Sequence, residues 1–255
     1  MFNNQLTLFL FSCIILSSNL CYAKKQNEII IVTEEFPPYT IINRTNQNTM
    51  TGTDTDIIKK VFTDLNIKIK IEERPWKRAL NEVKEGKAHA IYSLIKTKER
   101  EGFLWFPAQT LTSEKNILIT RKKSKIQIKS LSDLNGRSVG TVKGYSYGKA
   151  FDEFKNFKRK EEAISNEQLL DILAASQPAR IDVAVMNDQV FRYLLKNRKD
   201  KDDFAISDFV INEEPFYLGF SKANNDGKKL MEKFDGVLER LRKKGRIAKI
   251  IKNYQ

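Results

Sequence analysis

The feature that most constrains the fold is a regular alternation of strand-like and helix-like segments. The β-branched run Glu28–Thr33 predicts a buried strand, and apolar residues on one face predict a helix from Asp56 to Leu65. Residues 67–71 alternate Ile with charged side chains, which is typical of a strand with one wet face. A helix bounded by Pro75 and Gly86 follows, and then a buried strand at Ala88–Ser93. Such alternation predicts an α/β fold in which helices cover a mostly parallel sheet.

The same order recurs in the second half of the chain. Strands are expected at Ser138–Val142 and Ile181–Met186, with helices after Ser165 and at Val190–Leu195. Ser165 with Gln168 three residues later matches a capping box, which is typical of a helix start. Two sheets in succession predict two lobes with separate cores.

The chain must then pass between the lobes twice. The strand Lys115–Thr120 is placed at the first crossing, and the acidic pair Glu213-Glu214 at the return. An amphipathic helix from Leu230 to Leu241 should pack back on lobe one. We therefore expect lobe one in residues 24–115, lobe two in 116–212, and a return to lobe one in 213–255.

The N-terminal segment has the features of a cleaved secretory signal peptide. Residues 1–23 contain no charged side chain, are apolar from Leu6 to Leu16, and end in Cys21-Tyr22-Ala23. The alternatives are a membrane anchor or a buried helix, but the apolar run is shorter than the roughly 20 residues that span a bilayer. We therefore expect a periplasmic protein that is at most peripheral to the membrane.

Composition excludes several chemistries for the exported chain. Both cysteines, Cys13 and Cys21, lie in the signal segment, so disulfides and thiolate ligands are not expected. The single histidine, His89, lies between alanines, and neither a metal nor a cofactor is proposed. Lysines and arginines, which give a net charge of +13, occur in every segment and are densest at Arg242–Lys252, but there is no compact basic helix interleaved with aromatics, so nucleic acid is not an expected partner. An attraction to anionic envelope components is expected instead.

The stretch from Arg74 to Arg100 is predicted to form one wall of a small-molecule pocket. Trp76 and Arg78 lie at the start of the predicted helix, and residues 96–100 form a loop where the buried strand ends. In open α/β sheets, ligands bind beyond the carboxyl ends of the strands. The loop of residues 144–147 follows a strand of lobe two directly and should face this wall.

Several short motifs together resemble the family-3 extracytoplasmic solute-binding proteins, the receptors of polar amino acid ABC importers. These motifs are Glu35–Tyr39, Gly52–Ile57, Pro75-Trp76, Thr97–Arg100, Leu131–Gly144 and Arg180–Ala184. The resemblance implies a type II periplasmic-binding-protein fold, with two lobes joined by two crossing hinge strands. It also implies a monomer that closes on a small ligand and delivers it to an ABC-transporter permease.

The resemblance also implies roles for individual residues. Arg100 matches the arginine that binds the ligand carboxylate, and a guanidinium has the paired donors for that task. Ser93 matches a hydroxyl or backbone donor near the same end of the ligand, and Ser146 one on lobe two. Phe36 and Trp76 match the aromatic positions on either side of the ligand side chain. Further ligand contacts are expected from the remaining residues of the two pocket loops: Glu35, Tyr39 and Tyr145.

Two departures from the family pattern affect the expected ligand. Asn187 stands where the family usually has the aspartate that binds the α-ammonium group, with Asp188 beside it, and Ile95 replaces a Ser or Thr. Arg78 has no regular counterpart. Together with Arg100 it would suit a ligand with two anionic groups, or else it faces solvent or pairs with a glutamate. The expected ligand is an amino acid or a related carboxylate.

Two other functions stay open alongside the receptor, which is not expected to be an enzyme. A cyclohexadienyl-dehydratase-like enzyme would need a general acid or base, for which Asp188, Glu35 and Glu213 are the candidates. A ligand-sensing module would present its closed form to a membrane receptor.

Overall fold

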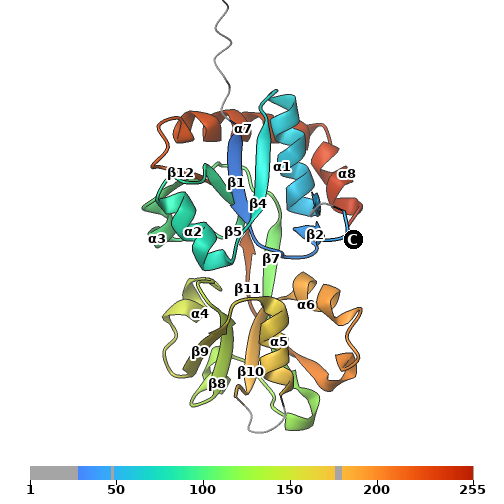
Figure 1. Cartoon of the computed structure of the whole chain (residues 1–255). Helices are drawn as coiled ribbons and strands as arrows, with labels where there is room; N and C mark the ends of the chain where they lie inside the picture. The colour runs from blue at the N-terminus through green and yellow to red at the C-terminus, as the bar shows by residue number, and fades with distance from the viewer. Residues whose placement is uncertain (1–27, 47–48, 176–179, 255) are drawn as a thin grey trace, which may run out of the picture.

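The computed structural model describes residues 28–46, 49–175 and 180–254, which form two lobes stacked one above the other (Figure 1). The expected signal peptide lies outside the described residues. None of the described helices is long and apolar enough to span a membrane.

Lobe one is built on a five-stranded sheet in the order β4-β1-β5-β12-β6. Its strands are β1 (Ile29–Thr33), β4 (Ile69–Glu73), β5 (Ala90–Leu94), β6 (Leu104–Trp105) and β12 (Tyr217–Ser221). Strand β1 pairs in parallel with β4 and β5, whereas β12 is antiparallel to β5 and β6. A short antiparallel ribbon is formed by β2 (Ile41–Asn43) and β3 (Thr49–Thr51). The helices are α1 (Thr53–Asp64), α2 (Trp76–Lys84), α3 (Lys98–Glu101), α7 (Gly227–Lys243) and α8 (Arg246–Lys252).

Lobe two is built on a second five-stranded sheet in the order β11-β7-β10-β8-β9. Its strands are β7 (Ser113–Arg121), β8 (Ser138–Val142), β9 (Lys158–Ala163), β10 (Val183–Asn187) and β11 (Phe204–Pro215). Strand β8 is parallel to β9 and β10, and β7 is antiparallel to β10 and β11. The helices are α4 (Lys149–Glu153), α5 (Asn166–Ala174) and α6 (Asp188–Leu195), with 3-10 turns η1 (Lys122–Ser124), η2 (Leu131–Leu134) and η3 (Lys201–Asp203). Each sheet is thus mixed: one strand, β12 in lobe one and β7 in lobe two, runs antiparallel to its neighbours on both sides.

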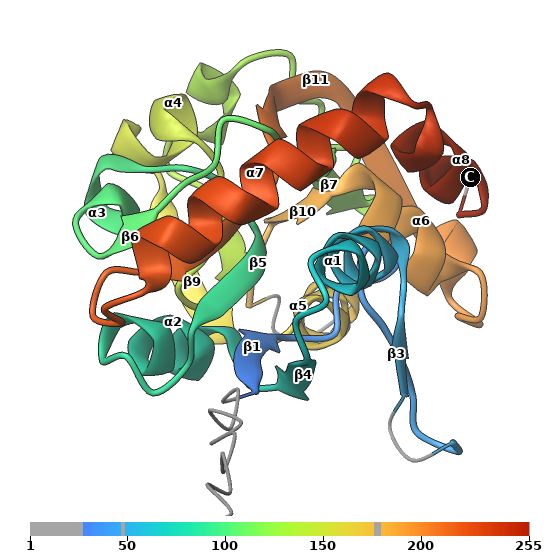
Figure 2. The same cartoon turned by 90° about the horizontal axis from the view of Figure 1, so that it is seen from above.

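Strands β7 and β11 carry the chain between the lobes (Figure 1). They pair from Phe204 opposite Arg121 to Pro215 opposite Ser113. The divisions expected at residues 115 and 212 fall inside these continuous strands, so the exact boundaries stay a prediction. Helix α7 returns to lobe one and crosses its far end, with α8 at its C-terminal side (Figure 2).

Each lobe has its own apolar core. In lobe one, α1 and α7 pack against the sheet through Phe62, Phe220 and Phe234, with ring centroids 5.5–5.6 Å apart. In lobe two, α5 and α6 bury Leu170 and Phe191 against the strands. The predicted packing of the C-terminal helix on lobe one is confirmed.

The sequence-based boundaries were wrong in three places. Helix α1 begins at Thr53 rather than at Asp56, because Gly52 turns the chain beneath the backbone of Tyr39. The predicted loop at residues 96–100 contains the short helix α3, whose first turn is capped by the Thr97 side chain. Strand β11 extends through the acidic pair at 213–214, so the return between the lobes is made by a continuous strand rather than beginning at that pair.

Gly52 gives a test of this local geometry. Its φ is +115°, and an added Cβ would lie 2.5 Å from the carbonyl oxygen of Tyr39. We expect Gly52→Ala to lower the free energy of unfolding by about 1–3 kcal/mol. Gly236 in α7 has no atom near its Cβ position. Gly236→Ala is therefore the matched control and should raise the free energy of unfolding by roughly 0.5–1 kcal/mol. Urea unfolding midpoints measure both, and an unchanged midpoint for Gly52→Ala would contradict the assigned turn.

Candidate functional site

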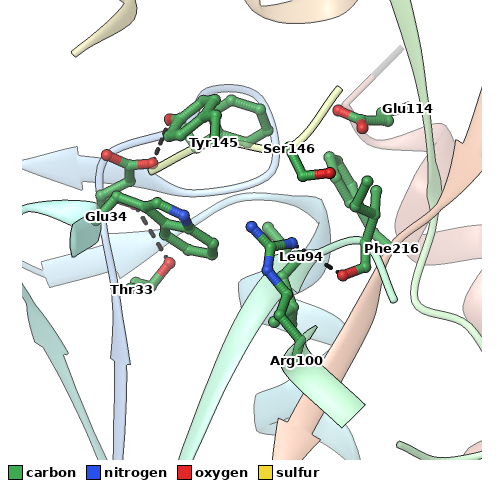
Figure 3. A pocket seen from close by; sticks show the side chains of 12 residues that line it. Thr33, Glu34, Leu94, Arg100, Glu114, Tyr145, Ser146 and Phe216 are labelled. Atoms are coloured by element: carbon green, nitrogen blue, oxygen red, sulfur yellow. Dashed lines mark hydrogen bonds between the residues drawn. The ribbon is translucent and has the colours of Figure 1, made fainter. Parts of the chain in front are cut away.

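A small cavity lies where the two lobes meet, and Figure 3 shows its lining. Lobe one contributes the carboxyl ends of β1 and β5 and the starts of α2 and α3, whereas lobe two contributes the loop after β8. The lining residues are Thr33, Glu34, Phe36, Trp76, Ser93, Leu94, Ile95, Arg100, Glu114, Tyr145, Ser146 and Phe216. A wider groove shares Arg100, Tyr145 and Ser146 with the cavity and runs outward past α2, α3 and α4.

Arg100 places a buried positive charge in this cavity. Only 6% of the residue is exposed, and its Nη1 donates to the carbonyl oxygen of Ile95 at 2.9 Å. The guanidinium carbon lies 5.7 Å from the ring centroid of Trp76, within reach of a cation–π interaction. Burial lowers the pKa of Arg100 to about 10, so the group is charged at neutral pH. Among the described residues it has no ion-pair partner, and its remaining donors are available to an anion.

Two buried carboxyl groups line the same cavity. Burial raises the pKa of Glu34 to about 8, and the O–H of Tyr145 donates to its Oε1. Burial raises the pKa of Glu114 to about 7, although Asn116 donates to its Oε1 at 2.9 Å and the charge of Arg100 opposes the shift. A carboxyl group with a raised pKa becomes ionised when a cation binds next to it. The cavity therefore combines one fixed positive charge with two acids that can become negative.

Ser93 is held by a third buried acid below the cavity. Its Oγ donates to Asp54 Oδ2 at 2.7 Å, and Thr112 Oγ1 donates to the other carboxylate oxygen at 2.7 Å. Burial raises the pKa of Asp54 to about 7. Ser93 also has a positive φ of 56°, which is rare for a residue other than glycine and typical of functional sites. Because the Ser93 hydroxyl already donates its proton to Asp54, it would act toward a ligand mainly as a hydrogen-bond acceptor.

Aromatic rings form the apolar walls. Phe36 stacks on Tyr39 at 5.4 Å between centroids and meets Phe216 edge-on at 5.8 Å. Trp76 meets Tyr145 edge-on at 5.8 Å. An apolar wall with a few convergent polar groups is the usual composition of a small-molecule site.

Three hydrogen bonds join the lobes around the cavity. The indole Nε1 of Trp76 donates to the carbonyl oxygen of Gly144 at 3.1 Å, and Tyr145 donates to Glu34. The side-chain amide of Asn187 donates to the Tyr39 hydroxyl at 3.3 Å. The described conformation is therefore a closed one.

Glu35 was expected among the ligand contacts but does not line the cavity, and Arg78 takes the alternative expected for it, an exposed side chain paired with a glutamate. Glu35 is exposed and pairs with Arg44 at 2.8 Å, while its neighbour Glu34 points into the cavity (Figure 3). Arg78 is exposed and pairs with Glu82 at 2.7 Å. Two residues along a helix turn the side chain by about 200°, so Arg78 cannot share the direction of Trp76.

Tyr39, Asn187 and Asp188 lie behind or beside the lining. The Tyr39 hydroxyl donates to the carbonyl oxygen of Ser113 at 3.1 Å, and Asn187 Oδ1 caps α6 by accepting from Val190 N at 3.0 Å. Asp188 is the first residue of α6 and pairs with Arg192 at 2.9 Å. Phe36, Trp76, Ser93, Arg100, Tyr145 and Ser146 do come together at the cavity, and their contact with a ligand stays a prediction.

Three of the lining residues, Glu34, Glu114 and Phe216, were not predicted from the sequence. Glu34 directly follows β1, so the end of that strand was the available signal. Glu114 lies near the start of β7, one residue before the predicted strand began. Phe216 lies between β11 and β12, a position with no periodic signal.

Comparison with known proteins gives one consistent answer. Residues 29–255 match the model of the bacterial extracellular solute-binding proteins, family 3. The chain is 23% identical over 207 residues to the arginine-binding extracellular protein ArtP of Bacillus subtilis, covering 80% of this chain and 77% of that protein.

Two solved structures have the same fold. A mutant of ArgBP from T. maritima superposes with a TM-score of 0.75 at 20% identity, covering 89% of this chain and 94% of that one. An amino acid ABC transporter substrate-binding protein from Streptococcus pneumoniae bound to L-arginine gives a TM-score of 0.73 at 24% identity, with coverage of 89% and 94%. Since the family model spans nearly the whole described chain, this protein belongs to family 3 of the bacterial extracellular solute-binding proteins.

Proposed function

We propose that this protein is a periplasmic receptor that closes on a zwitterionic amino acid with a cationic or hydrogen-bond-donating tail and delivers it to an ABC permease. The observation that carries this proposal is the buried Arg100 guanidinium, which faces a closed interlobe cavity without an ion-pair partner in the described chain.

Arg100 is the proposed binding site for the ligand carboxylate. A guanidinium presents two parallel donors that match the two oxygens of a carboxylate. Only one donor, Nη1, is used within the described protein, by the carbonyl oxygen of Ile95. A bound carboxylate would thus satisfy donors that burial has removed from water.

Glu114 and Glu34 are the proposed binding sites for positive groups of the ligand. Glu114 lies close enough to Arg100 for that charge to affect its pKa, so it can hold an α-ammonium group in place of the aspartate that Asn187 replaces. Glu34 lines the cavity beside Tyr145 and would accept from a cationic tail (Figure 3). The names of the related proteins from Bacillus subtilis and Streptococcus pneumoniae, which mention arginine, support a basic amino acid.

Closure is proposed to be a hinge motion about β7 and β11. Both strands run between the lobes, and such paired crossings permit rotation with little change inside each lobe. The closed form, fastened by Trp76 and Tyr145, would be the one that the permease recognises.

A dehydratase-like activity remains the competing function because of one observation. Glu34 has the raised pKa and the cavity position that a general acid needs, whereas Glu35 and Asp188 do not line the cavity. Incubation with prephenate or arogenate separates the two functions: turnover would favour the enzyme, and tight amino acid binding without turnover favours the receptor.

The carboxylate assignment predicts a large effect of Arg100→Ala. Two charge-assisted hydrogen bonds are lost, so L-arginine should bind at least about a hundredfold more weakly. Arg78→Ala is the matched control, because its exposed side chain should leave affinity within about twofold. Isothermal calorimetry measures both, with thermal melting to confirm folding. Equal affinity of wild type and Arg100→Ala would refute the assignment.

The raised pKa of Glu34 predicts that the ligand-free protein closes more readily at low pH. An exposed glutamate titrates near about 4.3, so closure takes up a proton between that pH and about 8. The closed form is then most stable below the open-state pKa and loses stability as pH rises through about 8. Small-angle scattering should give a larger radius of gyration at about pH 8 than at about pH 5.

Two substitutions test whether Glu34 causes this pH dependence. Glu34→Gln removes the titrating group and should flatten the profile, leaving the smaller contribution of Glu114. Glu35→Gln, next to it but exposed, should keep the wild-type profile. A profile that is flat in the wild type, or unchanged by Glu34→Gln, would contradict the linkage.

A further inference from the structure

A strongly basic surface of the described chain lies on the two C-terminal helices, away from the ligand cavity. Residues 227–252, which contain α7 and α8, hold ten lysines and arginines against three acidic residues. Their excess of positive charge is more than half of the net +13 of the whole chain. This concentration is local, because the rest of the chain carries lysines and acids in closer balance.

Helical periodicity gathers part of this charge into a stripe. Helix α7 buries Leu230, Phe234, Val237, Leu238 and Leu241 against lobe one. Cations at spacings of four and seven residues lie along one outward flank of the helix, and α8 continues them with a sequence that has no acidic residue. We call the exposed set the basic end face: Lys229, Lys233, Arg240, Lys244, Arg246, Lys249 and Lys252.

The charges of the basic end face are not compensated within the described chain. None of its seven members forms an ion pair there, although several other surface cations do. Of the three acids of α7, Glu239 pairs with Lys243 at 2.6 Å and Asp235 accepts from Gln109 N at 2.7 Å, while Glu232 is exposed and forms no ion pair with the basic end face in the described chain. The face therefore keeps its full positive potential.

The position of the basic end face suits a partner with an extended surface. Helix α7 crosses the end of lobe one that is farthest from lobe two, as the two views show (Figures 1 and 2). With 17 residues it is about 25 Å long, and α8 extends the charged surface beside it. An elongated, convex row of cations fits an extended anionic surface better than it fits a small molecule.

We propose that the basic end face docks the receptor on the anionic phospholipid surface of a membrane. Each Lys or Arg near such a surface adds a favourable, salt-sensitive attraction. Insertion is not part of the proposal, because the large apolar residues exposed in the described chain, Ile164 and Ile206, are both in lobe two. Stacked nucleic-acid bases would need exposed aromatic rings, and Phe234, the one aromatic residue of α7 and α8, is buried.

Docking by this face would leave the binding cleft free. Lobe two lies at the opposite side of lobe one from α7 (Figure 1), and the cavity is lined by residues where the two lobes meet. The receptor could therefore open and close while it stays near the membrane. The inference rests on charge and geometry and is independent of which ligand the cavity holds.

Vesicle flotation of the full chain tests the proposal. Vesicles of phosphatidylcholine mixed with phosphatidylglycerol are compared with phosphatidylcholine alone, at low and physiological ionic strength. The test variant neutralises four members of the basic end face: Lys233→Gln, Arg240→Gln, Lys244→Gln and Lys249→Gln. The control variant makes the same charge change on exposed lysines of lobe two: Lys122→Gln, Lys123→Gln, Lys129→Gln and Lys199→Gln. Both variants keep the N-terminal segment, so any contribution from it cancels.

We expect binding to the anionic vesicles that weakens with salt, and at least about a tenfold loss in the test variant. The control variant should stay within about twofold, with L-arginine affinity and thermal stability unchanged in both. Equal losses in the two variants would overturn the proposal by showing that net charge alone is responsible. Equal binding to neutral vesicles, or capture by heparin without vesicle binding, would overturn it as well.

Discussion

The structure depends on a positive charge that the protein keeps away from water. Arg100 is buried at the junction of the lobes, and the depression of its pKa to about 10 reflects the cost of that burial. A buried charge without a counter-charge costs several kcal/mol, which the Ile95 carbonyl and the Trp76 ring offset only in part. The site is therefore electrostatically incomplete until an anionic group enters it.

The surrounding elements are arranged around this charge. Helix α3 is short, and its cap from Thr97 fixes the backbone of Arg100. Glu34 and Glu114 stay protonated more readily than ordinary carboxyl groups, so the empty cavity need not hold two negative charges. Lobe two contributes Tyr145 and Ser146 from its loop after β8, and Glu114 from the hinge strand β7. Lobe one thus forms most of the site. Lobe two closes over it through two hydrogen bonds, one from Trp76 to the carbonyl oxygen of Gly144 and one from Tyr145 to Glu34.

Much of the fold could be predicted from the sequence because periodicity and helix capping report on local structure. The order of the strands that bear apolar residues and the packing of α7 were predicted in this way. Strand β9 and helix α4 were not, because the strand sequence from Lys158 to Ala163 is mostly charged and lies at a sheet edge. The site was only partly predictable for a similar reason. Glu34 points into the cavity and its neighbour Glu35 points to solvent, so an error of one residue in the sequence selects the wrong carboxyl group. Glu114 lines the cavity because the hinge strand β7 passes there, which no local sequence pattern indicates.

The most direct test of the account compares L-arginine with agmatine, which is the same molecule without its carboxylate. Isothermal calorimetry of the exported protein at neutral pH measures both affinities. If Arg100 binds the ligand carboxylate, agmatine should bind at least about a hundredfold more weakly than L-arginine. Equal affinities for the two compounds would show that the buried guanidinium is not the anion site, and would contradict the account.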